Sequence, residues 1–301
     1  MATGPGPASG SAYVQLATSM ALVGANVAVA KVLSEALPIA LVASLRCVLA
    51  CLVLWPLARF RDGPAAIPRP AELRNLALQA LFGTAVYNAG LLAGLRLTGA
   101  LEAGLVLSTL PAVVALGAAA WLRERLPPRG WAAVALAVAG MGAITLARTD
   151  AGSGGAGSTA GNALVFAGVC GEAVYVLLAR RVAGRVPVLT ASLWMQAFSA
   201  AVLLPFALPD LGAAGALVAE PRLGALLVFH SLTASVLCVA LWYAGLRRVP
   251  AGVAGLFTGF LPVTAALVGV AALGEPVSAH HVAGFGLMGA SLLLAARGAR
   301  R

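Results

Sequence analysis

Long apolar runs alternate with short polar segments along almost the whole chain. A helix of roughly 18 or more apolar residues is long enough to cross the ~30 Å hydrocarbon core of a bilayer. The runs predict ten transmembrane helices, at about 12–32, 37–58, 73–95, 99–121, 129–147, 161–180, 187–208, 223–246, 250–273 and 279–296. The sequence therefore predicts an all-α integral membrane protein that is in contact with the lipid bilayer along most of its length.

Basic residues concentrate in every second segment between the runs. If successive loops lie on alternate sides, one side receives fifteen of them: Arg59, Arg61, Arg69, Arg74, Arg123, Arg125, Arg129, Arg180, Arg181, Arg185, Arg247, Arg248, Arg297, Arg300 and Arg301. The other side receives Lys31, Arg96, Arg148 and Arg222, while Arg46 lies inside the second run. Cytoplasmic loops are the ones enriched in Lys and Arg, so both termini are predicted to be cytoplasmic.

Composition supports the membrane assignment. Hydrophobic residues make up 61% of the chain and charged residues 10%, against about 45–50% and 25% in soluble domains. The net charge of +10 would suggest a nucleic-acid partner only if the arginines formed a stripe on a soluble surface, so none is expected. The four cysteines lie in apolar runs, which favours small buried side chains over disulfides. The first run lacks a positive n-region, so we expect it to remain as a helix rather than be cleaved.

The chain contains an internal repeat. Pro38 and Pro56 recur 149 residues later as Pro187 and Pro205, and Leu110-Pro111 and Glu124 recur 151 residues later as Leu261-Pro262 and Glu275. Prolines and charges are rare here, so compositional bias explains this register poorly. The predicted divisions are a tail (1–11), a first repeat (12–148), a flexible linker (149–160), a second repeat (161–297) and a basic tail (298–301). Each repeat holds five runs, an odd number, so the repeats are predicted to be inverted, an architecture typical of alternating-access carriers.

Several segments of the chain resemble the EamA family, a branch of the drug/metabolite transporter superfamily. These are Gly24-Ala25-Asn26 through Lys31, Ser44-Leu45-Arg46, and Gly94 through Glu124, within a likeness that extends over about residues 12 to 297. The resemblance implies a ten-helix carrier of the bacterial inner membrane that exports amino acids or related metabolites, aromatic and other neutral amino acids above all. One departure is that Trp194 or Met195 stands in the second half where the first has Arg46.

Two ionisable residues are predicted to lie in the middle of membrane helices. Arg46 falls mid-way along the second run and Glu172 mid-way along the sixth. Such groups cost about 2.5–3.5 kcal/mol each at a helix centre on insertion scales, so they are candidates for function. Arg46 would bind a carboxylate through its planar fork, and Glu172 would bind an ammonium group or a proton. The alternative is that the two side chains neutralise each other or cap backbone carbonyls, and only hold helices together.

Other polar and aromatic residues complete a candidate substrate cavity. Gln79 and Tyr87 share a helix face with Gly83, Gly90 and Gly94, a face that would otherwise serve as a close helix contact. The full candidate set is Asn26, Arg46, Gln79, Tyr87, Ser108, Glu172, Tyr175, His230, Trp242 and Phe260. His230 would couple protons to transport if it titrates, or would simply be hydrogen-bonded, and Phe260 would otherwise face lipid.

Pro111 and Pro262 are predicted hinges, because prolines in membrane helices free backbone carbonyls. The sequence has no Walker loop, HExxH or GxSxG motif in the expected context. We therefore expect no cofactor, no metal site and no enzymatic activity. The leading hypothesis is a secondary carrier for a small-molecule substrate. Export of other metabolites or cationic drugs is the alternative within transport, and a channel or an integral membrane enzyme is the alternative outside it.

Overall fold

The computed structural model describes residues 10–63, 67–95, 97, 106–107, 109–124, 126–147, 159–261, 264, 268 and 279–298. Ser108, Pro262 and residues 149–158 of the predicted linker lie outside this set. The helices are α1 (Gly10–Ala36), α2 (Ile39–Arg61), α3 (Pro70–Ala80), η1 (Leu81–Val86), α4 (Tyr87–Leu95), α6 (Leu110–Trp121), α7 (Pro128–Ala147), α8 (Thr159–Val182), α9 (Val188–Ala207), η2 (Leu208–Ala214), α10 (Gly215–Ala219), α11 (Pro221–His230), η3 (Ser231–Leu237), α12 (Cys238–Leu246), α13 (Ala251–Phe257) and α15 (Ala279–Gly298). Within the described residues there is no β-strand, so the all-α prediction is confirmed.

Four of the described helical segments are both long and apolar enough to cross a membrane. They are Ile39–Arg61, Thr159–Val182, Val188–Ala214 and Pro221–Leu246. Each begins and ends within a few residues of a predicted span, or continues beyond it as α9 does into η2. The larger count of ten spans remains a prediction. All four cysteines are free, and Cys47 and Cys238 are buried, in agreement with the role expected of them.

Prolines set the beginnings of repeat-related helices. Pro38 and Pro187 occupy the N-cap positions of α2 and α9 with nearly the same backbone, φ −55° and ψ 134° in one and φ −55° and ψ 145° in the other. Pro70 and Pro221 begin α3 and α11. Proline suits these places because its φ is already helical and no N–H is required there. The duplication seen in the sequence is therefore also present in the backbone.

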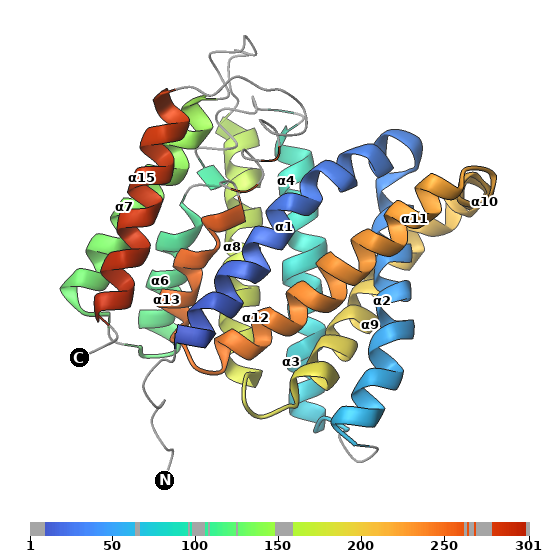
Figure 1. Cartoon of the computed structure of the whole chain (residues 1–301), viewed down its shortest axis with the longest axis horizontal. Coiled ribbons are helices and arrows are strands. Elements are labelled where there is room, and N and C mark those ends of the chain that lie inside the picture. The colour runs from blue at the N-terminus through green and yellow to red at the C-terminus, as the bar shows by residue number, and fades with distance from the viewer. Residues whose placement is uncertain are drawn as a thin grey trace.

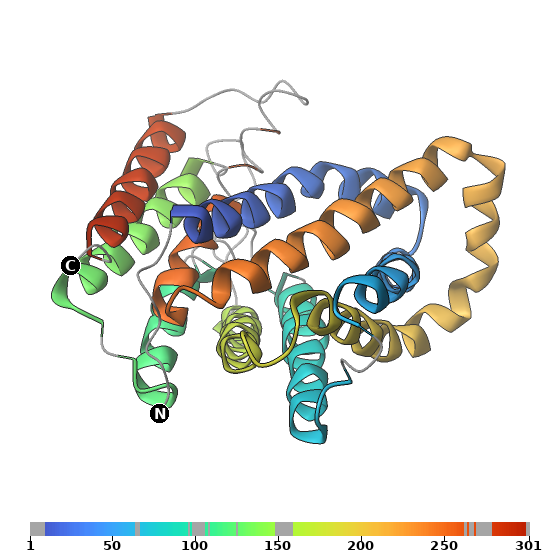
Figure 2. The same ribbon diagram turned by 60° about the horizontal axis from the view of Figure 1, so that its bottom comes forward.

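The helices pack in pairs that respect the duplication (Figure 1). α2 lies along α9, α7 along α15, and α6 against α13, so each of these pairs joins equivalent helices of the two halves. α4 lies along α8, and α1 lies along α12. These two pairs are equivalent to each other, because α12 is the repeat mate of α4 and α8 is the repeat mate of α1. Figure 2 shows α1 and the long α11–η3–α12 segment side by side across the molecule. A pseudo-two-fold relation between the halves explains this pattern.

Equivalent helices of the two halves run in opposite directions. The carboxylate of Asp62, at the end of α2, accepts hydrogen bonds from Thr190 at the start of α9, from the backbone N–H at 2.8 Å and from the hydroxyl at 2.8 Å. α2 and α9 are therefore antiparallel, as inverted repeats require.

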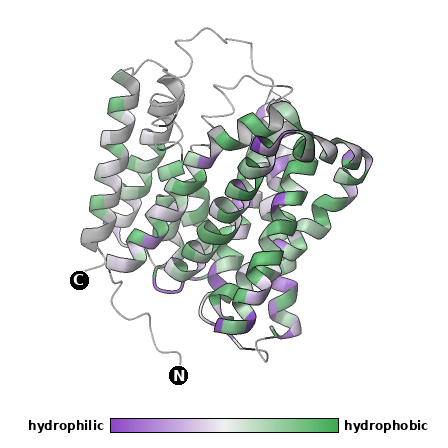
Figure 3. Ribbon diagram, turned by 45° about the vertical axis from the view of Figure 1, so that its right-hand side comes forward, coloured by the Kyte–Doolittle hydropathy of each residue, from purple (hydrophilic) through white to green (hydrophobic). Residues whose placement is uncertain are grey.

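The arginine-rich segments gather at one end of the molecule. Arg180 at the end of α8 lies 3.5 Å from the Glu124 carboxylate and donates to the carbonyl of Leu246 at the end of α12 (3.2 Å). Arg248 donates to the hydroxyl of Ser11 at the start of α1 (3.2 Å). Figure 3 shows hydrophilic residues at this lower end and apolar residues along the middle of the helices. Within the described residues the arginine-rich segments therefore lie at one end of the molecule, and the assignment of this end to the cytoplasm remains a prediction.

Replacing Asp62 by alanine is expected to destabilise the protein by about 1–2 kcal/mol, because the backbone N–H and the hydroxyl of Thr190, in the first turn of α9, lose their acceptor. Thermal unfolding of the purified protein measures this loss. The Asp62→Asn variant keeps an acceptor oxygen and should recover part of it. Equal stability of wild type and Asp62→Ala would show that these two hydrogen bonds contribute nothing to the free energy of unfolding.

Candidate functional site

A cavity of about 190 Å³ lies where the two halves meet. Its volume is below the roughly 300 Å³ of typical drug-sized pockets, so it suits a small metabolite. α1, α2, η1, α8, α9, η3 and α12 all contribute to its wall. The lining residues are Ser19, Met20, Val23, Arg46, Gly83, Thr84, Glu172, Tyr175, Met195, Gln196, Ser199, Ala234, Ser235, Cys238, Val239, Trp242 and Leu261.

Four of the ten candidate residues meet on this wall. Arg46 comes from α2, Glu172 and Tyr175 come from α8, and Trp242 comes from α12. They lie in three helices and in both halves of the chain, so only the packing of the halves brings them together. The repeat mate of Arg46, Met195, also lies on the wall. The unequal charge contribution of the two halves is therefore a feature of the cavity itself.

Arg46 and Glu172 line the same cavity without forming an ion pair. The one ion pair within 4.0 Å in the described part of the chain joins Arg180 to Glu124 at the arginine-rich end. An intramembrane charge without a partner is costly. The interpretation in which Arg46 and Glu172 neutralise each other therefore does not describe this conformation.

Three of the lining residues carry a buried polar atom that has no hydrogen-bond partner among the described residues. These atoms are the Nε of Arg46, the Nε1 of Trp242 and the hydroxyl oxygen of Ser235. Both nitrogens can only donate. Buried polar groups are nearly always paired, and an unpaired one calls for a functional or structural reason. Two donors and a hydroxyl beside one cavity are complementary to an acceptor such as a carboxylate.

Two π-helical segments, which the apolar pattern of the sequence does not predict, contribute to the cavity wall. η1 and η3 occupy repeat-related positions. Gly83 and Thr84 of η1 are matched by Ala234 and Ser235 of η3, and all four residues line the cavity. The sequence contains a sign of this relation, because a small residue followed by a hydroxyl residue recurs 151 residues later. Short π-helical turns are often found at functional sites.

Side chains from neighbouring helices bond to these π-helical segments. Gln196 of α9 donates to the Ser235 carbonyl (3.0 Å), and the hydroxyls of Ser199 and Thr84 lie 3.1 Å apart. Ser231 of η3 donates to the carbonyl of Arg46 (2.8 Å). The backbone that carries the Arg46 guanidinium is thereby tied to the second half of the chain.

Asn26 and His230 form a buried pair beside the cavity rather than on its wall. The Nδ1 of His230 lies 2.9 Å from the Oδ1 of Asn26, which also accepts from the Thr233 hydroxyl at 3.0 Å. The amide nitrogen of Asn26 donates to the carbonyl of Leu22 (2.9 Å). Because an amide oxygen only accepts, the His230 Nδ1 is the donor. His230 is thus hydrogen-bonded to Asn26, and its coupling to protons remains a hypothesis.

Gln79 is also placed away from the cavity wall. It is fully buried, accepts a 2.5 Å hydrogen bond from the hydroxyl of Tyr243, and donates to the side chain of Asn75 (2.7 Å). Tyr243 is 1% exposed. The contact joins α3 of the first half to α12 of the second.

Replacing Tyr243 by phenylalanine should lower the free energy of unfolding by about 1–3 kcal/mol, because the Gln79 oxygen stays buried without its donor. The double variant Gln79→Leu/Tyr243→Phe should lose less than the sum of the two single losses. Thermal unfolding provides the comparison, and the KM for substrate should stay unchanged. An altered KM would place Gln79 in the substrate site.

The remaining candidates lie elsewhere in the described structure. Phe260 stacks on Phe257 (centroids 6.0 Å apart), and Phe257 stacks on Tyr13 (5.6 Å). Tyr87 is half-buried at the start of α4. Pro111 is buried in the first turn of α6, where a proline fits without loss of a hydrogen bond.

Comparison with known proteins agrees with this architecture. Residues 10–146 and 159–297 each match the EamA-like transporter family. The "Uncharacterized transporter YetK" of Bacillus subtilis (strain 168) is 32% identical over 273 residues, which cover 91% of this chain and 83% of that protein. A solved structure described as "Crystal structure of protein" superposes with a TM-score of 0.78 at 22% identity, over 95% of this chain and 96% of that one. The chain therefore belongs to the EamA-like transporter family and is a multi-pass membrane transporter.

Proposed function

We propose that this protein is a secondary carrier that exports neutral or aromatic amino acids, or similar small zwitterions, across the bacterial inner membrane. The observation that carries the proposal is the pair of opposite charges, Arg46 and Glu172, that line one cavity between the halves without pairing with each other. A free amino acid has a carboxylate and an ammonium group, and would supply the missing partner to each.

The roles of the lining residues follow from their hydrogen-bonding capacity. The Arg46 fork would hold the substrate carboxylate, with the Ser235 hydroxyl and the Trp242 indole N–H as further donors. Glu172 would hold the ammonium group. Tyr175 and Trp242 would give the side-chain end of the cavity aromatic surface, which favours apolar and aromatic side chains.

Transport would follow from movement of the two halves against each other. We take the divisions at 12–148 and 161–297, joined by the linker 149–160, as the moving units. The two π-helical segments, which contribute to the cavity wall in both halves, are the proposed bending points. Pro111 and Pro262 are the further hinge candidates that the sequence offers. The Asn26–His230 pair is the proposed place for any coupling to protons.

Counterflow into proteoliposomes tests this function. Labelled neutral amino acid should accumulate when unlabelled amino acid is inside, and uptake should saturate, which a channel would not show. Methyl esters and N-acetyl derivatives of the same amino acid should fail to compete, because each removes one charge. Equal competition by the esters, which keep only the ammonium group, would favour the second candidate, export of organic cations bound through Glu172 alone.

A further inference from the structure

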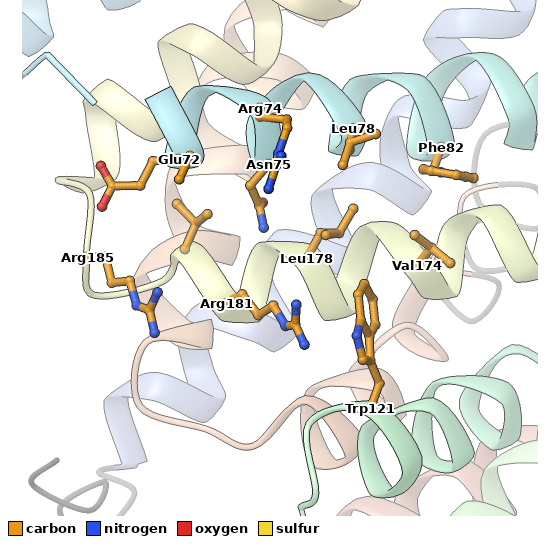
Figure 4. A pocket seen from close by; sticks show the side chains of 12 residues that line it. Glu72, Arg74, Asn75, Leu78, Phe82, Trp121, Val174, Leu178, Arg181 and Arg185 are labelled. Carbon is orange, nitrogen blue, oxygen red and sulfur yellow. The ribbon is translucent and has the colours of Figure 1, made fainter. Parts of the chain in front are cut away.

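A groove of about 670 Å³ lies apart from the central cavity. It lies between α3 and α8, with Trp121 of α6 at its side (Figure 4). Its lining residues on α8 include Val174, Leu178 and Arg181, which the helical rotation of about 100° per residue places roughly opposite Glu172. The groove therefore lies on the outer side of α8, away from the proposed substrate path.

The groove is amphipathic along its length. Figure 4 shows Glu72 and Arg185 at one end, Arg74 and Arg181 nearer the middle, and Phe82 and Val174 at the other end. Leu78 and Leu178 extend the apolar half from the two facing helices. The basic end coincides with the arginine-rich end of the molecule, and the apolar end reaches toward the middle of α8.

The positive charge at the basic end is not neutralised by the protein. No carboxylate lies within 4.0 Å of the guanidinium of Arg74, Arg181 or Arg185 in the part of the chain that the structure describes. Glu72 lines the same end, and its carboxylate accepts the backbone N–H of Arg69 at the start of α3 (2.8 Å). Three guanidinium groups and one carboxylate therefore line this part of the groove.

An aromatic ring holds Arg181 in place. Its guanidinium carbon lies 4.2 Å from the centroid of the Trp121 ring, a cation–π contact. The neighbouring Arg180 instead pairs with the carboxylate of Glu124 (3.5 Å). Tryptophan at a membrane–water interface and arginine beside it are the usual surroundings of a lipid headgroup.

We propose that this groove binds an anionic phospholipid, with its phosphate at Arg74, Arg181 and Arg185 and one acyl chain along Leu78, Phe82 and Leu178. Basic pockets between transmembrane helices bind acidic headgroups. The apolar half of the groove is what favours a lipid over free phosphate, which would leave that surface without a ligand. A lipid so placed would rest on α3, α6 and α8 at once, and would link helices of both halves.

Native mass spectrometry of the full-length protein in detergent tests the proposal, with phosphatidylglycerol and phosphatidylcholine as probes. The Arg181→Gln/Arg185→Gln variant should bind phosphatidylglycerol about 10- to 30-fold more weakly than wild type, with phosphatidylcholine binding unchanged. Arg59→Gln/Arg61→Gln is the matched control, because it removes the same charge from exposed positions at the end of α2 outside the groove. It should change the affinity less than about threefold.

Three results would overturn the proposal. An equal loss in both double variants would mean a diffuse surface charge rather than a site. Displacement of the lipid by millimolar inorganic phosphate as readily as by phosphatidylglycerol would mean a free-phosphate site. Unchanged affinity in Arg181→Gln/Arg185→Gln would exclude the groove. If that variant fails to fold, Arg74→Gln on α3 removes the third guanidinium without altering α8, and its affinity should fall at least threefold.

Discussion

Replacing Arg46 by alanine is expected to raise the KM for a neutral amino acid at least about 30-fold in counterflow. Truncating one member of a buried, hydrogen-bonded charge pair costs about 2–5 kcal/mol, and tenfold in affinity corresponds to about 1.4 kcal/mol. Arg46→Lys keeps the charge and loses the planar fork, so its KM should lie between those of wild type and Arg46→Ala. The measurement is the concentration dependence of uptake into proteoliposomes.

Glu172→Gln gives the reciprocal test at the other end of the substrate. It should weaken binding of the amino acid and reduce the penalty for an N-acetylated analogue, whereas Arg46→Ala should reduce the penalty for a methyl ester. Arg222→Ala, an exposed arginine on α11, is the matched control and should transport normally. Wild-type KM values in well-folded Arg46→Ala and Glu172→Gln would make both residues structural and refute the proposed binding mode.

The second large effect concerns Gly90, where α4 approaches α8 most closely at backbone level. A Cβ atom on Gly90 would lie 2.7 Å from the carbonyl oxygen of Leu164 and 2.8 Å from the backbone nitrogen of Gly168. Backbone atoms cannot yield as a flexible side chain can, so Gly90→Ala must push the two helices apart. We expect it to cost about 1–3 kcal/mol, as overpacking of a close-packed core does.

Thermal unfolding of the purified protein measures the effect, with two comparison variants. Gly168→Ala faces the same contact with more room, 3.1 Å to the Tyr87 carbonyl, and should lose less. Gly286→Ala on α15 meets nothing within 4 Å and should be neutral or stabilising by up to about 1 kcal/mol. Equal stability of Gly90→Ala and Gly286→Ala would contradict the close contact.

The face shared by Gln79, Tyr87 and the three glycines shows how far spacing along one helix can lead. The spacing predicted that these residues share one face, and it left open whether the face binds substrate or packs on a helix. The glycines pack on α8, and Gln79 bonds to Tyr243. Which partner a face meets depends on the rotation of another helix about its own axis, and residue spacing along one helix does not record that rotation.

The sequence by itself determined the helical class, most helix limits, the duplication and the separation of charge. These depend on local properties: the length of an apolar run, the restricted backbone of proline, and the cost of moving arginine across a bilayer. Pro38 and Pro187 begin α2 and α9 as their neighbours in sequence dictate. The family resemblance rests on the same local patterns.

Only the tertiary structure decided which of the polar residues share a cavity. Arg46, Glu172 and Trp242 are separated by 70 residues or more along the chain and meet because the inverted halves pack against each other. The same packing places Asn26 and His230 beside the cavity and forms the groove between α3 and α8. These contacts come from the antiparallel pairing of distant helices, and their energies depend on shape and burial that no single helix possesses.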